Sequence, residues 1–241
     1  MIAVQSLMLA GVRVGHAQSL ECWRLSNHYL REHFPAVEVW ADKEGEAWLQ
    51  NAGLSYDAWH RLPEVAEECR GVWCVGKLLA AAQQKGPFLH VDGDVFWRQA
   101  PPEAAFLVQH DEGPRPQWWQ QAGFGPMAMP ARPNSYNFGV FGGSAWQEIA
   151  GACRAVLDCL ESHRALVAGS GCWFLPMLVE QVWVPALLAE RGIPPTPLLR
   201  VGHLKEDADR LRYFHAGGAK SDPTLRDLLA KRWADLKREA A

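Results

Sequence analysis

Hydrophobic positions follow two different periods along the first half of the chain. Residues 37–40 alternate between apolar and polar as a short strand does, and an apolar first strand is predicted within residues 1–10. Helices are predicted over residues 43–50 and 72–84, and over 19–33, where apolar residues recur at helical spacing at Leu20, Trp23, Leu25, Tyr29 and Leu30. Because strands and helices alternate, the pattern predicts an α/β fold with a mostly parallel sheet covered on both faces.

The second half continues with both kinds of element, but its boundaries are less regular. Residues 54–70 fit neither period, and residues 113–133 are predicted to form a long loop. Pro185 is expected to kink the second of two long helices. Strands are predicted from 87 to the Asp-Gly-Asp at 92–94, and at 104–109, 137–143, 194–199 and 211–214, and helices at 144–166, at 171–191 and from 223 onward. No repeat or linker divides the chain, so residues 1–241 are predicted to form a single domain.

The most informative segment is the apolar run 87–96, which delivers Asp92 and Asp94 on either side of Gly93. Buried carboxylates are costly unless they are paired or bind a cation, so this pattern indicates a site for a hard metal ion. The glycine is interpreted as leaving room for a bulky anionic ligand near the backbone. Asp-Gly-Asp is also common in turns, and the tripeptide alone does not decide between these interpretations.

A second informative segment lies far downstream, at residues 213–220. It places His215 at a strand end, followed by Gly217, Gly218 and Lys220. An imidazole can complete a Mn²⁺ site beside two carboxylates, while backbone N–H groups and a lysine suit phosphate oxygens. The alternative is a histidine at a glycine turn with a solvated lysine.

Together the two segments resemble the nucleotide-sugar glycosyltransferases of GT-A architecture, and glycosyltransferase family 8 in particular, which contains retaining galactosyltransferases and glycogenin-like enzymes. That family combines Asp-X-Asp with a later His-X-X-Gly-X-X-Lys. His215 and Gly218 match this spacing, whereas Lys220 arrives one residue early and Ser221-Asp222 replaces the usual Pro-Trp.

The resemblance implies a GT-A fold and transfer of a hexose from a nucleoside-diphosphate sugar, in particular a UDP-sugar, with retention of configuration. It implies Mn²⁺ or Mg²⁺ held by Asp92, Asp94 and His215. The donor would be bound by Asp92, Gly217, Gly218 and Lys220. The acceptor would be a saccharide, a glycan or a lipid-linked sugar.

Two residues between the two segments, and one on the helix before the first segment, also match the resemblance. It implies that Asn137 faces the sugar pocket, that Glu180 lies near the reaction centre and that Lys77 lies near the donor. Each has a plain structural alternative: an asparagine that satisfies a turn, a glutamate on a solvated helix face, and a surface lysine whose stem covers apolar area. His110 to Glu112 and the residues Trp97, Trp118 and Trp119 could also line the pocket, or serve as loop and core.

Composition excludes several classes of function. The net charge is −3 and basic residues form no long run, which argues against a nucleic-acid binder. No apolar run reaches membrane-spanning length, and the scattered cysteines lack metal spacing, so the protein is predicted to be cytoplasmic. Two rival functions stay open: a haloacid-dehalogenase-like phosphatase, which also places Asp-X-Asp after a strand, and a non-catalytic module that binds nucleotide sugars.

Overall fold

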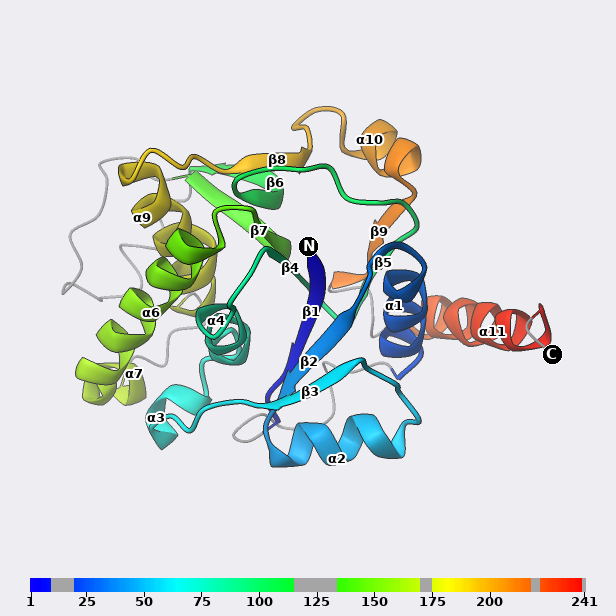
Figure 1. Ribbon diagram of the computed structural model, residues 1–241, viewed down its shortest axis with the longest axis horizontal. Helices are drawn as coiled ribbons and strands as arrows, with labels where there is room; N and C mark the ends of the chain where they lie inside the picture. Colours follow the sequence, from blue (N-terminus) through cyan, green and yellow to red (C-terminus); the bar gives the residue numbers. More distant parts are fainter. Residues whose placement is uncertain (10–19, 115–133, 170–174, 218–221, 240–241) are drawn as a thin grey trace.

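The computed structural model describes residues 1–9, 20–114, 134–169, 175–217 and 222–239 (Figure 1). Within these residues, seven strands form one sheet in the order β3-β2-β1-β4-β7-β6-β8, and β5 and β9 form a separate ribbon. β7 runs antiparallel to both of its neighbours, and the other pairings of the large sheet are parallel. The predicted α/β fold class, with a mostly parallel sheet flanked by helices, is confirmed.

The elements begin and end as follows. The strands of the large sheet are β1 (Ile2–Leu7), β2 (Val37–Ala41), β3 (Ala58–Arg61), β4 (Phe88–Val91), β6 (Leu107–Pro114), β7 (Asn134–Gly143) and β8 (Thr196–Leu199). The ribbon consists of β5 (Val95–Trp97) and β9 (Tyr213–His215). The helices are α1 (Leu20–His33), α2 (Lys43–Asn51), α3 (Glu67–Arg70), α4 (Val75–Ala82), α6 (Trp146–Ser162), α7 (Arg164–Gly169), α8 (Leu175–Met177), the π-helical segment η1 (Leu178–Trp183), α9 (Val184–Glu190), α10 (Leu204–Leu211) and α11 (Pro223–Glu239).

Helices cover the two faces of the large sheet because successive residues of a strand point to opposite faces. In β1, Val4 faces a core that it shares with α4, α6, η1 and α9. Its neighbour Ala3 faces a second core, built with α1, α2 and Leu211 of α10. A smaller cluster joins α1, β5 and α11, and α11 extends from this side of the molecule in Figure 1.

The order of the strands creates a switch point between β1 and β4. From β1 the chain moves outward on one side to β2 and β3, and it then returns to place β4 on the other side of β1. In open α/β sheets, ligands bind outside the carboxyl ends of the strands at such a point. Asp92 directly follows β4, so it lies at this position.

Several elements differ from the sequence prediction. The strand that leads to Asp92 ends at Val91, and the turn from Asp92 to Asp94 is followed by β5, a strand outside the large sheet that was not predicted. The ambiguous stretch 54–70 contains β3 and α3, and α10 was not predicted.

The helix around Pro185 is irregular. The helix widens into η1 just before it, and Pro185 then lies in the first turn of α9. A proline is tolerated in the first turn of a helix, where the N–H that it lacks would have no partner within the helix.

No helix of the described residues combines the length and the apolar composition needed to cross a bilayer. Most of the predicted loop 113–133 lies outside the described residues, as do Trp118 and Trp119. β6 runs on to Pro114, so it is longer than the predicted strand 104–109.

Candidate functional site

Asp92, Asp94 and His215 lie together at the carboxyl edge of the sheet. Each offers a ligand atom, and these atoms all lie within 4.8 Å of one another. The short ribbon brings the histidine in, because β5 pairs with β9 with Val95 opposite His215. His215 Nε2 lies 3.4 Å from Asp94 Oδ1, and the backbone N–H of Ala216 donates to the Asp94 carbonyl at 2.9 Å.

The chemistry of these three side chains fits a divalent metal ion. Mn²⁺ and Mg²⁺ prefer carboxylate oxygens, and an imidazole suits Mn²⁺ as an additional ligand. Two ligands of one octahedral ion at ~2.1 Å lie no more than about 4 Å apart, so small side-chain rotations would close the observed spacing. Two neighbouring carboxylates also repel each other, and a cation between them removes that repulsion.

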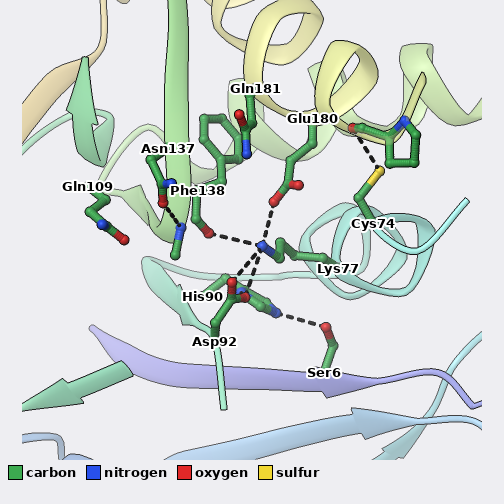
Figure 2. Close-up of polar contacts among 12 residues, drawn as sticks. Ser6, Cys74, Lys77, His90, Asp92, Gln109, Asn137, Phe138, Glu180 and Gln181 are labelled. Carbon is green, nitrogen blue, oxygen red and sulfur yellow. Dashed lines mark hydrogen bonds and ion pairs between the residues drawn. The ribbon is translucent and has the colours of Figure 1, made fainter. Parts of the chain in front are cut away.

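A buried lysine, Lys77, forms an ion pair with Asp92, the first of the two aspartates (Figure 2). Lys77, in the first turn of α4, places its Nζ 2.9 Å from Asp92 Oδ1 and 2.5 Å from Glu180 Oε1. It also donates to the Phe138 carbonyl at 3.0 Å. These three partners account for the three donors of an ammonium group, so Lys77 orients Asp92 and is not a surface lysine.

Burial and charge shift the pKa values of this network. Burial raises the pKa of Glu180 to about 7, although Lys77 acts in the opposite direction. Burial also raises the pKa of Asp92, where Lys77 lowers it and the Asp94 charge raises it further. Burial alone would lower the pKa of Lys77, but the two carboxylates raise it above its ordinary value, so Lys77 stays charged.

His90 lies beside Asp92, and its buried position favours the neutral imidazole. Burial, with Lys77 nearby, lowers its pKa well below the ordinary value. Its Nε2 lies 2.8 Å from Ser6 Oγ of β1, and its Nδ1 lies 3.8 Å from Asp92 Oδ1. A neutral ring at that distance adds no charge to the site, so Lys77 is the cation that faces Asp92 from this side.

The glycine of Asp-Gly-Asp has a different role from the one expected. A Cβ on Gly93 would lie 2.3 Å from the Trp23 ring, so the space is filled by α1. The interpretation that Gly93 makes room for a ligand is therefore wrong. The glycine that the site requires is Gly139 of β7, where a Cβ would lie 2.8 Å from the His215 ring and 2.1 Å from Gln109 Oε1.

Asn137 lies on β7, next to this group. Its Oδ1 accepts from the backbone N–H of Gly139 at 2.9 Å, and its Nδ2 donates to Glu112 Oε1 at 3.2 Å. Gly139 in turn accepts from the backbone N–H of Asp92 at 2.9 Å. Asn137 is thus held in place two residues from the strand position that contacts Asp92.

The structure brings most of the predicted residues together. Lys77, Asp92 and Glu180 form one network, and Asp94 and His215 adjoin it. Glu180 is fully buried, so the alternative of a solvated helix face is wrong. Its predicted contact with the reacting sugar stays a prediction.

Of the remaining predicted residues, Gly217 and Trp97 lie in the part of the chain that the structure describes. Gly217 follows His215 with a left-handed backbone (φ 49°) that favours glycine. Gly218 and Lys220 lie outside the described residues. Trp97 is 1% exposed and belongs to the core, so it cannot serve as a platform in the pocket.

Sequence reasoning missed the role of Gly139 and the buried position of Lys77. The signal for Gly139 was present, because a glycine inside a strand often marks a close approach of another group. Nothing in the sequence indicates which group approaches, since His215 comes from a distant strand.

A model described as a family of unknown function (DUF6734) matches residues 14–110, a range that contains Lys77, Asp92 and Asp94 but ends before His215. The curated proteins contain no match. Among solved structures, the crystal structure of mouse xyloside xylosyltransferase 1 in its apo form is similar, with 10% sequence identity and a TM-score of 0.48, over 92% of this chain and 99% of that one.

Proposed function

We propose that this chain is a metal-dependent glycosyltransferase of GT-A type that uses a nucleoside-diphosphate sugar. The observation that carries the proposal is the convergence of Asp92, Asp94 and His215 at the carboxyl edge of a switch-point sheet. A divalent ion held there would bind the diphosphate and neutralise the charge of the leaving group.

The surrounding residues prepare this site in ways that follow from their contacts. Lys77 keeps Asp92 in position while Glu180 keeps Lys77 charged and fixed. Because Lys77 and Glu180 are buried, the position of Asp92 is set before any ligand arrives, which is the condition for electrostatic stabilisation of developing charge. We assign Gly217, Gly218 and Lys220 to the diphosphate, and Asn137 to the sugar pocket.

Calorimetry with UDP-glucose and UDP, each with and without Mn²⁺, tests the proposal. We expect binding that requires the metal, and in Asp94→Asn we expect affinity to fall at least about a hundredfold, because removing a metal ligand costs more than removing an outer partner. The matched control is Asp207→Asn, which changes an aspartate on α10 with no part in this site, and should bind as the wild type does.

The same protein separates the rival functions. Donor hydrolysis or sugar transfer in the presence of Mn²⁺ supports an active transferase, and nucleotide-sugar binding without turnover indicates a non-catalytic module. Turnover of an aryl phosphate without nucleotide-sugar binding would instead identify a phosphatase. If the wild type binds neither UDP-glucose nor UDP with the metal present, the proposal is wrong. The anomeric configuration of a transfer product, read by NMR, tests the expected retention.

A further inference from the structure

Trp73 is an exposed aromatic residue that lies beside Lys77 of the candidate site. It lies two residues before the first residue of α4, and the chain runs from the end of this helix into β4. The start of α4 is therefore at the same edge of the sheet as the carboxyl end of β4, where Asp92 lies. Trp73 is 42% exposed, whereas the other tryptophans that the structure describes are buried or half-buried.

The tryptophan is linked to the predicted metal site through one side chain. The Lys77 Nζ lies 5.8 Å from the centre of the Trp73 ring, within the range of a cation–π contact. The same ammonium lies 2.9 Å from Asp92 Oδ1. The Trp73 ring therefore contacts Lys77, and Lys77 contacts Asp92, which we assign to the metal.

The backbone around Trp73 is anchored although its side chain is exposed. Val72 and Cys74, on either side, are buried. Cys74 Sγ donates to the Pro176 carbonyl of α8 at 3.3 Å. An exposed aromatic ring on a fixed backbone loses little conformational freedom when a ligand stacks on it, which favours binding.

We propose that Trp73 is a stacking platform for a ring of the nucleotide-sugar donor, either the base or the hexose. This inference rests on the proposed function. Both rings are joined to the diphosphate, directly or through the ribose, so a diphosphate at Asp92 and Asp94 brings one of them near this edge. Aromatic side chains stack on any base through its π-face, and sugar rings pack on the same surface through their apolar face.

Calorimetry in Mn²⁺ with three probes tests the inference: UDP, UDP-glucose and inorganic pyrophosphate. We expect Trp73→Ala to weaken binding of the ring-bearing probes by about tenfold, in line with the loss of one stacked ring, and to leave pyrophosphate within about twofold. Trp73→Phe should restore most of the affinity. Trp59→Ala, on the edge strand β3, is the matched control for loss of an indole, and thermal unfolding checks that each variant is folded.

The probes separate the possible outcomes. Equal weakening of UDP and UDP-glucose supports stacking on the base, and weakening of UDP-glucose alone supports stacking on the hexose. An equal loss for pyrophosphate overturns the inference, because Trp73 would then act only by shielding Lys77. Unchanged binding of all three probes also overturns it. A wild type that binds none of them overturns the proposed function, and this inference with it.

Discussion

Two groups of charged side chains in this molecule are built in opposite ways. On α10, Asp207 accepts from the backbone N–H of Arg200 at 2.9 Å and from its guanidinium at 2.8 and 2.9 Å, and Arg210 lies 3.3 Å away. Two cations therefore face one carboxylate. Beside β4, one lysine faces both Asp92 and Glu180, and Asp94 is close by.

The two groups differ accordingly in their pKa values. Hydrogen bonds from Arg200 lower the pKa of Asp207, so its charge is satisfied within the chain. Burial raises the pKa of Asp92 even with Lys77 beside it. A group that holds more carboxylates than cations is stabilised by an added cation, and this surplus of negative charge distinguishes a candidate binding site from a structural ion pair.

Removing the lysine should have the largest effect. In Lys77→Met, the fully buried Glu180 and the half-buried Asp92 lose their cation, and we expect the free energy of unfolding to fall by about 4 kcal/mol, as measured by urea unfolding. Adding Glu180→Gln should recover part of this loss, because one of the stranded charges is then removed. A Lys77→Met protein as stable as the wild type would show that the network does not depend on Lys77.

The pH dependence of stability should show the contribution of Glu180. Its pKa is raised from 4.5 to about 7 in the folded protein, so the folded state binds the proton more tightly than the unfolded state. Its contribution is therefore fully present below pH 4.5 and is lost as the pH rises toward 7, by roughly 3 kcal/mol.

Urea unfolding of the wild type and Glu180→Gln without divalent ions, at several pH values from 4.5 to 7.5, measures this contribution. We expect the free energy of unfolding of the wild type to fall relative to that of Glu180→Gln as the pH rises over this range. A constant difference would mean that Glu180 does not titrate between these values.

Removing the charge of Asp207, which is paired with Arg200, should have the smallest effect on stability. Asp207→Asn removes a carboxylate whose pKa is lowered, so its stabilising contribution is present above the ordinary value of 3.8 and declines as the pH falls below it. We expect a smaller drop in melting temperature at pH 7 than for Lys77→Met, and a gap to the wild type that narrows in acid. A loss of Mn²⁺-dependent nucleotide binding in this variant would contradict the division between the two groups.

Helices and strands whose side-chain spacing is regular within their own segment could be predicted from the sequence. The stripe in α1 and the apolar strand before Asp92 follow from side-chain spacing alone. β3, β5 and α10 could not be found that way. β5 is a short strand that needs β9 as its partner, and this pairing joins segments far apart in the chain.

The site was predictable only in part, for the same reason. Asp92 and Asp94 stand at the end of an apolar run, and His215 stands before glycines, so each was visible in its own segment. The salt bridge between Lys77 and Glu180 joins two helices that lie apart in sequence, and only the folded chain brings them together. Both residues could have been surface charges on the sequence alone, but in the folded chain they are buried, and Lys77 positions Asp92.

A crystal structure with UDP and Mn²⁺ would test the central claim most directly, because the anomalous signal of manganese locates the ion without assumptions. We predict one strong peak between the carboxylates of Asp92 and Asp94 and the imidazole of His215, at ~2.2 Å from the ligand atoms, with the diphosphate on its open side. Bound UDP with no anomalous peak at these three residues, or with the ion held elsewhere, would contradict the account.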